Sequence, residues 1–344
     1  MHRMAPVHCA AREVATFLIV IMLGVVALGI PSGAQAATEA PGHWKAEWPR
    51  TDFSKHSVPL GEIRDVIRKD GIPAIDLPKF GTAKQAAGLG LADKEPVVSI
   101  AINGDARAYP LRMLTWHEIV NDKVGGVPVS VTFCPLCNSA IVFDRRLGGR
   151  VLDFGTTGKL RNSDLVMYDR QTQSWWQQFL GKGLVGELSG KELKMLPMRM
   201  ESFAKFRKRH PDGKVLIPGN SSLRPYGRNP YRGYDSSSRP FLYPGALPKG
   251  IPPLERVVVV GKEAWAFSLL RKVKKVEAGD IVITWEAGQA SALDAGFIKD
   301  GKDVGNVVVQ RRTKDGKLVD AVHDVSFAFA FHAFYPKGKI HVAE

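Results

Sequence analysis

Residues 131–144 read VTFCPLCNSAIVFD, so two short apolar runs flank the tetrad Cys134-Pro135-Leu136-Cys137. Both runs are rich in β-branched or aromatic residues, and a tight turn between such runs predicts an antiparallel hairpin. Asn103-Gly104, a strong hairpin signal, separates two further runs of this kind upstream. Strands that follow one another with only short helices between them predict a β-rich α+β fold built of antiparallel meanders.

The chain divides by composition into five segments. A short helix is expected at residues 61–70, where Ile63, Val66 and Ile67 share one face, and the Pro-, Gly- and Tyr-rich stretch before residue 255 reads as a long connector. The predicted segments are a signal peptide (1–36), an N-terminal arm with the short helix (37–94), lobe 1 with the cysteine tetrad (95–217), the connector (218–254) and lobe 2 (255–344).

The N-terminus has the features of a secretory signal. Arg3 and Arg12 precede an apolar run at residues 15–30, and Ala34-Gln35-Ala36 offers the small residues of a cleavage site. The apolar run is shorter than the roughly 20 residues that span a bilayer. We therefore predict cleavage near Ala36 and Ala37, a periplasmic or secreted protein, and no integral membrane protein after cleavage.

The net charge of the chain does not identify a binding partner. The formal net charge is +14, and it becomes +13 when Arg3, Arg12 and Glu13 are removed with the signal. A basic balance favours anionic partners. Lys and Arg are nevertheless scattered, without a basic helix or an alternation with aromatic residues, so we expect no nucleic-acid binding. The sequence identifies no other partner.

Lobe 2 echoes lobe 1 in three places and in the same order, which predicts an internal duplication. Residues 255–269 resemble 95–111, residues 281–294 lie over 131–144 without a gap, and residues 331–340 lie over 206–215 with a shared Pro-x-Gly-Lys ending. In this alignment Thr284 and Ala287 take the places of Cys134 and Cys137. Lobe 2 is then a cysteine-free copy, and the thiols are not demanded by the fold.

Four segments also resemble a bacterial exported family that is known only as domain of unknown function 3179. They are YPLRMLTWHEIVND at 109–122, GGVPV at 125–129, FCPLCN at 133–138 and NSDLVMYDR at 162–170. The resemblance extends over roughly residues 60–343. The family motif has Gly after the second cysteine where this chain has Asn138, and the resemblance implies no activity.

Cys134 and Cys137 are the only cysteines left once Cys9 departs with the signal. A Cys-Pro-x-Cys turn between strands has the shape of a metal knuckle, and the residue after it needs a positive φ that Asn tolerates. We therefore predict a zinc or copper site. His117, the nearest histidine, is the expected third ligand. The remaining ligand candidates are Glu118, His210, His323 and His332.

Two interpretations of the cysteines stay open beside the metal site. A thiol-disulfide oxidoreductase would use one cysteine to attack and the other to resolve, but residues 139–143 lack the helix that activates such a thiol. A ligand-binding module with a cleft between the lobes would need only a structural disulfide, which stabilises little across so short a loop. The familiar nucleotide and hydrolase motifs are missing, and the sequence leaves open whether the protein is an enzyme.

Further pocket candidates follow the tetrad. Asn162, Asp164, Asp169 and Arg170 could line a pocket, although turn formation and a surface ion pair are the simpler and preferred explanation. Trp175 and Trp176 are adjacent on a strand and so face opposite ways, which places one in the core and leaves Trp176 for a cleft or a partner surface. For His117, the simpler alternative is a hydrogen bond to a backbone carbonyl.

Overall fold

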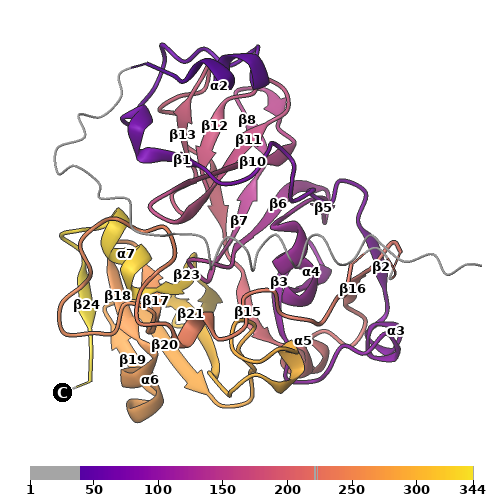
Figure 1. The fold of residues 1–344 in the computed structure, drawn as a ribbon. Coiled ribbons are helices and arrows are strands. Elements are labelled where there is room, and N and C mark those ends of the chain that lie inside the picture. Colours follow the sequence, from indigo (N-terminus) through magenta and orange to yellow (C-terminus); the bar gives the residue numbers. More distant parts are fainter. Residues whose placement is uncertain (1–38, 221, 223, 344) are drawn as a thin grey trace, which may run out of the picture.

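The computed structural model describes residues 39–220, 222 and 224–343. The predicted signal peptide lies outside these residues. Strands account for 39% of the structure and helices for 16%, which confirms the β-rich prediction. The strands form several small antiparallel sheets in a propeller-like arrangement (Figure 1).

The strands, in their order across each sheet, are as follows. The first sheet contains β1 (Ile63–Asp65), β10 (Phe154–Arg161), β11 (Asp164–Asp169), β12 (Trp175–Gln177) and β13 (Lys182–Val185). The second contains β14 (Lys194–Leu196), β7 (Ser139–Asp144), β6 (Val127–Cys134) and β5 (Ile119–Val124). The third contains β15 (Arg199–Ser202), β3 (Pro96–Ile102), β4 (Asp105–Pro110), β16 (Lys214–Ile217) and β2 (Lys79–Gly81).

Lobe 2 supplies two more sheets. One contains β23 (Asp324–Phe327), β17 (Arg256–Val260), β18 (Glu263–Ala266) and β24 (Lys339–His341), and the other β19 (Lys275–Ala278), β20 (Ile281–Glu286), β21 (Asn306–Arg312) and β22 (Leu318–Asp320). A small ribbon pairs β8 (Arg146–Leu147) with β9 (Arg150–Val151). The helices are α2 (Gly42–Glu47), α3 (Ala83–Gly88), α4 (Leu111–His117), α5 (Phe203–Arg209), α6 (Phe267–Val273) and α7 (Ala328–Phe334), with 3-10 turns η1 (Leu60–Glu62), η2 (Tyr234–Ser236) and η3 (Ile298–Asp300).

The hairpins follow from local turn chemistry. Asn103 and Gly104 both take positive φ, 50° and 81°, as the predicted turn between β3 and β4 requires. The helix predicted at residues 61–70 is wrong, because this segment forms η1 and β1. Its strand pairs with β10, and the amides of Val66 and Ile67 both donate to the carbonyl of Gly158 at 3.0 Å. Pairing with a distant strand therefore outweighs the local helical pattern.

The two lobes share a topology. The sheet order β15-β3-β4-β16 in lobe 1 matches β23-β17-β18-β24 in lobe 2, and in each the last strand lies parallel to its neighbour. The order β5-β6-β7-β14 likewise matches β19-β20-β21-β22. Equal strand order is consistent with the predicted duplication, which stays a prediction. One buried apolar core extends through both lobes, so neither lobe has its main core to itself.

The register between the lobes differs from the sequence alignment. The amide of Phe133 donates to Glu118 O at 2.8 Å, and the amide of Trp285 donates to Lys274 O at 2.9 Å, each directly after a helix. These equivalent bonds place Glu286, not Thr284, at the position of Cys134. The gap-free match of 281–294 to 131–144 is therefore wrong, because residues 287–305 separate β20 from β21 where four residues separate β6 from β7.

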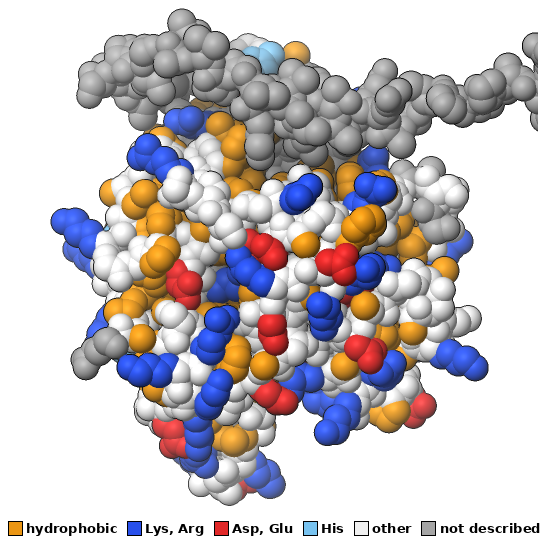
Figure 2. Space-filling view, turned by 60° about the horizontal axis from the view of Figure 1, so that its bottom comes forward, with side chains coloured by type: hydrophobic (Ala, Val, Ile, Leu, Met, Phe, Trp, Pro, Cys, Tyr) orange, Lys and Arg blue, Asp and Glu red, His pale blue; other side chains and the backbone are white. Residues whose placement is uncertain are grey.

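Basic side chains are dispersed on the surface. On the face drawn in Figure 2, Lys and Arg are interspersed with Asp and Glu rather than gathered in one patch. Many are engaged in ion pairs, such as Arg199 with Asp320 at 2.6 Å. Across the described part of the chain, no helix is long and apolar enough to cross a membrane.

Candidate functional site

The cysteine hairpin has the predicted shape. Cys134 ends β6, Ser139 begins β7, and these two residues are paired across the turn. Asn138 takes φ 51°, as the knuckle requires. No helix follows Cys137, so the activating element of a thioredoxin-like site is missing from this described hairpin. Both cysteines are free thiols, exposed by only 2% and 0%.

The third group at the hairpin is Asp164, at the start of β11. One carboxylate oxygen of Asp164 and the two sulfurs all lie within 4.8 Å of one another. The turn before Asp164 is tight, with Ser163 at φ 64°, and the Ser163 carbonyl lies 3.5 Å from the Cys137 sulfur and 3.8 Å from the Cys134 sulfur. The β10–β11 turn therefore closes over the cysteine turn. We call Cys134, Cys137 and Asp164 the trio.

Asp164 is held by one oxygen only. Gln177 Nε2 donates to Asp164 Oδ1 at 2.6 Å, and the amide of Phe179 donates to the same oxygen at 3.0 Å. Oδ2 is buried and has no hydrogen-bond partner among the described residues. A buried acceptor without a partner is uncommon and points to an absent ion or water.

The charges around the trio are acidic. Burial raises the pKa of Cys134, and it raises the pKa of Cys137 further. Burial also raises the pKa of Asp164 to about 7 and that of Glu118, beside it, to about 8. The charged neighbours that act on Cys134 are Asp164 and Glu118. A cation would stabilise this arrangement, because thiolates and carboxylates that are buried together repel one another.

The connector covers the hairpin. Tyr234 Oη donates to the carbonyl of Leu136 at 3.0 Å and accepts the amide of Phe241 at 3.2 Å. The hydroxyl of Ser163 also donates to the carbonyl of Phe241. Burial is the main cause of the raised pKa of both Tyr231 and Tyr234. Glu118 and Cys134 contribute to the shift of Tyr231, and Cys137 and Cys134 contribute to that of Tyr234. Residues 234–241 of the connector thus lie against the cysteine turn and the β10–β11 turn.

His117 is not brought to the thiols. Its Nδ1 lies 2.8 Å from the carbonyl of Pro73, so Nδ1 carries the proton, and its Nε2 lies 2.8 Å from Tyr226 Oη. Both ring nitrogens are occupied, and the group assembled around the sulfurs contains Asp164 instead. The prediction of His117 as third ligand is replaced by Asp164, and the simpler alternative, a backbone hydrogen bond, describes His117.

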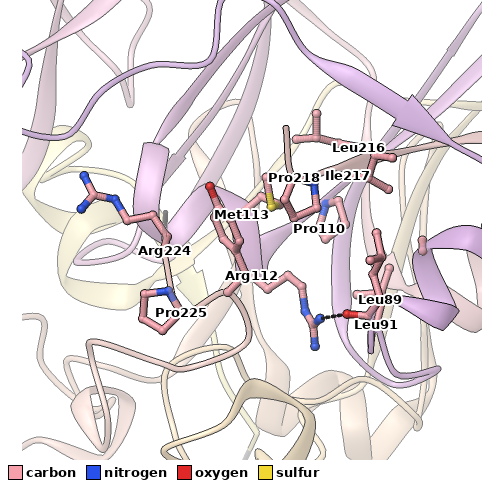
Figure 3. A pocket seen from close by; sticks show the side chains of 12 residues that line it. Leu89, Leu91, Pro110, Arg112, Met113, Leu216, Ile217, Pro218, Arg224 and Pro225 are labelled. Atoms are coloured by element: carbon pink, nitrogen blue, oxygen red, sulfur yellow. Dashed lines mark hydrogen bonds between the residues drawn. The ribbon is translucent and has the colours of Figure 1, made fainter. Parts of the chain in front are cut away.

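A cavity of about 180 Å³ opens beside Tyr226 (Figure 3). Its lining is mainly apolar and includes Met113, Leu216 and the guanidinium-bearing Arg112, which is paired with the buried Glu95 at 2.6 Å. All lining residues lie between 86 and 226. The cavity therefore belongs to lobe 1 with its flanking segments and is not the cleft expected between the lobes.

The other predicted pocket residues serve the structure. Asp169 accepts Trp176 Nε1 at 2.9 Å and binds the Thr172 hydroxyl, while Arg170 pairs with Asp76 at 2.6 Å. Trp175 and Trp176 are both fully buried, on opposite faces, so the placement of Trp176 in a cleft or partner surface is wrong.

The remaining candidates are also explained by local structure. Asn162 forms a turn, His210 directly follows α5 and contacts Arg209, and His323 is buried with its Nδ1 hydrogen-bonded to the carbonyl of Ala321. None of these joins the trio, and neither does His332.

Asp324 is a neighbour that the sequence did not indicate. It comes from β23 of lobe 2, accepts the Ser139 hydroxyl at 2.8 Å and accepts the Ala140 amide at 3.0 Å. Burial raises its pKa to about 7. The amide of Phe327 also donates to the carbonyl of Cys137 at 2.8 Å. Lobe 2 therefore holds the cysteine turn by hydrogen bonds from β23.

Fold and site together define a β-rich protein of small antiparallel sheets with a buried Cys-Cys-Asp group. The model of the family described as protein of unknown function, DUF3179, matches residues 69–338, and the chain belongs to this family. The family description assigns no activity. No curated protein and no solved structure matches the chain.

Proposed function

We propose that the protein is an exported metal-binding protein that holds one zinc ion with Cys134, Cys137 and Asp164. Export rests on the N-terminal sequence. The metal site rests chiefly on one observation, the buried Asp164 Oδ2, which forms no hydrogen bond within the described part of the chain and belongs to a carboxyl group that lies within 4.8 Å of two thiols. Zinc accepts sulfur and carboxylate ligands together, whereas a carboxylate is a poor ligand for Cu(I).

The thiol oxidoreductase is the weaker alternative. A catalytic thiol has to be reached by its partner and benefits from a lowered pKa. Cys134 and Cys137 are buried under the connector, and their pKa values are raised. Coordination is the chemistry that suits them, because a metal ion displaces the thiol protons and needs no contact with another protein.

Metal analysis tests the proposal. The purified protein is expected to bind one zinc ion, and Asp164→Asn to weaken zinc binding by at least 10- to 100-fold, as loss of even a supporting group does. Asp144→Asn is the matched control, since Asp144 is also buried but pairs with Arg146 at the far end of β7. Zinc affinity that is equal in wild type, Asp164→Asn and Cys134→Ser plus Cys137→Ser would refute the site.

A further inference from the structure

A small buried cavity lies between the two lobes. It has a volume of about 10 Å³, and every residue that lines it is buried. Asn138 and Met200 line it from lobe 1, and Arg256 and Gln289 line it from lobe 2. Asn138 directly follows Cys137, so one wall of the cavity is the cysteine turn.

Two side-chain amides in this cavity lack hydrogen-bond partners. Asn138 is 2% exposed and Gln289 is 4% exposed. Within residues 39–220, 222 and 224–343, Asn138 Nδ2 and Gln289 Oε1 are both buried and make no hydrogen bond. Buried polar atoms without a partner are uncommon and costly. One of these atoms is a donor and the other an acceptor, so a group that accepts one hydrogen bond and donates another would satisfy both.

The size and the charge of the cavity favour water as that group. A volume of about 10 Å³ is roughly the space that one water molecule needs. The positive charge of Arg256 is already balanced, because its Nη2 pairs with Asp235 at 3.0 Å and also donates to Ser291 Oγ at 2.7 Å. An anion is therefore not required. Water can accept from Asn138 and donate to Gln289 at the same time.

The cavity joins the two segments in which the lobes differ. Asn138 belongs to the cysteine turn of lobe 1, and Gln289 belongs to residues 287–305, the long segment between β20 and β21 of lobe 2. This long segment is also tied to the chain that enters lobe 1, because the amide of Ala290 donates to the carbonyl of Lys94 at 2.7 Å. The long segment of lobe 2 thus lies against the turn that lobe 2 itself lacks.

We propose that one buried water molecule bridges Asn138 Nδ2 and Gln289 Oε1, so that residues 287–305 hold the cysteine turn from lobe 2. The bridge adds to the hydrogen bond from the Phe327 amide to the Cys137 carbonyl, at 2.8 Å. Two successive residues of the turn are then fixed by lobe 2, Cys137 through its backbone and Asn138 through its side chain. The bridge goes beyond the proposed zinc site and does not depend on it, so it is tested in metal-free protein.

A crystal structure of the purified, metal-free protein tests the bridge directly. At a resolution that shows ordered water, we expect one peak of density in the cavity, within hydrogen-bonding distance of both Asn138 Nδ2 and Gln289 Oε1. A cavity without density, or a direct hydrogen bond between the two amides, would overturn the proposal. This arm needs no variant.

Coupling between the two residues is the second test. Gln289→Leu removes the acceptor and leaves Asn138 Nδ2 unpaired, so Tm should fall by about 3 °C. Asn138→Gly has little effect of its own, because Gly suits the positive φ at this position. It also removes the unpaired donor, so Gln289→Leu should lower Tm by less than half as much in the Asn138→Gly background.

Asn121→Leu is the matched control for this coupling. Asn121 is 3% exposed, but its amide is hydrogen-bonded to Asp76 and Phe154, and it does not line the cavity. Its replacement should lower Tm equally with and without Asn138→Gly. If Gln289→Leu also lowered Tm equally in both backgrounds, the two amides would not share a water molecule and the proposal would fail.

Discussion

β6 and β20 are each joined to the residue after a helix by an equivalent backbone hydrogen bond, and beyond that bond the two strands differ. Phe133 and Trp285 donate equivalent amides to Glu118 and Lys274, but the next residue is the buried Cys134 in lobe 1 and the exposed Glu286 in lobe 2. A tight cysteine turn follows in one lobe and a long excursion, 287–305, in the other. The strand order is therefore common to both lobes, whereas the turn after β6, which holds both cysteines, is particular to lobe 1.

The largest loss of stability is expected on truncation of a buried phenylalanine that occupies the same place in both lobes. Phe206 of α5 and Phe331 of α7 are both fully buried, and each ring lies against the glycine after its helix, where an added Cβ would be 2.5 Å from the ring atom Cζ. Phe206→Ala and Phe331→Ala should each lower the free energy of unfolding by about 3–5 kcal/mol. Urea unfolding measures both.

The matched control is Phe297→Ala. Phe297 is 44% exposed, and its replacement should cost less than about 1 kcal/mol. Costs at Phe206 and Phe331 that differ by more than about 2 kcal/mol would break the comparison between the lobes, because equivalent helices would then be unequally supported.

Asn138 tests the turn itself. Its φ of 51° suits Asn or Gly, so Asn138→Gly should leave the free energy of unfolding nearly unchanged. Asn138→Val should cost about 2 kcal/mol and weaken zinc binding, since a β-branched residue resists this conformation and would shift Cys137. Thermal unfolding and zinc titration check both variants. Equal behaviour of Gly and Val would mean that the turn adapts and does not set the site.

The free energy of unfolding of the metal-free protein should depend on pH, because lobe 1 buries two carboxyl groups at the cysteine turn. The pKa values of Glu118 and Asp164 are raised from 4.5 and 3.8 to about 8 and about 7, so the folded state binds more protons than the unfolded state between roughly pH 4 and pH 8. The free energy of unfolding should therefore fall as the pH rises through this window. We expect Tm to be at least about 3 °C lower at pH 8 than at pH 5, an effect of about 1 kcal/mol.

Substitution isolates the groups responsible. Glu118→Gln plus Asp164→Asn removes both carboxyls, so the slope of Tm against pH should flatten in the metal-free double variant. Zinc should reduce the slope in the wild type, since the proposed ion favours the charged form of Asp164. A slope that persists in the double variant would assign it to other acids, such as Asp324.

The parts predicted well from the sequence are those fixed by neighbours in the chain. Strand texture on both sides of the tetrad, the Asn103-Gly104 turn and the conformation of Asn138 all follow from a few adjacent residues. The helix at 61–70 failed for the opposite reason, because β10, about a hundred residues later, pairs with this segment. Local rules do not include such a partner.

The site was predicted only in half for the same reason. Cys134 and Cys137 are recognisable from the sequence alone. His117 was predicted as a ligand because it is the histidine nearest to them in sequence. In the structure, the end of α4 directs His117 toward Pro73 and leaves Glu118 buried. Asp164 follows a turn, and the sequence motif was explained more simply by turn formation. That explanation is also correct, because Ser163 takes a positive φ. Which of several acids meets the thiols is decided by sheet packing.

The smallest effect is expected at the residue that replaces Cys134 in lobe 2. Glu286 is exposed and pairs with Lys205, and exposed ion pairs contribute at most about 1 kcal/mol. Glu286→Gln should therefore change the free energy of unfolding by less than about 0.5 kcal/mol and leave zinc affinity untouched. Urea unfolding and zinc titration check this beside Cys134→Ser, the equivalent position in lobe 1. If Glu286→Gln lowered zinc affinity as Cys134→Ser should, the metal would not belong to lobe 1 alone, and the contrast between the two turns would lose its functional meaning.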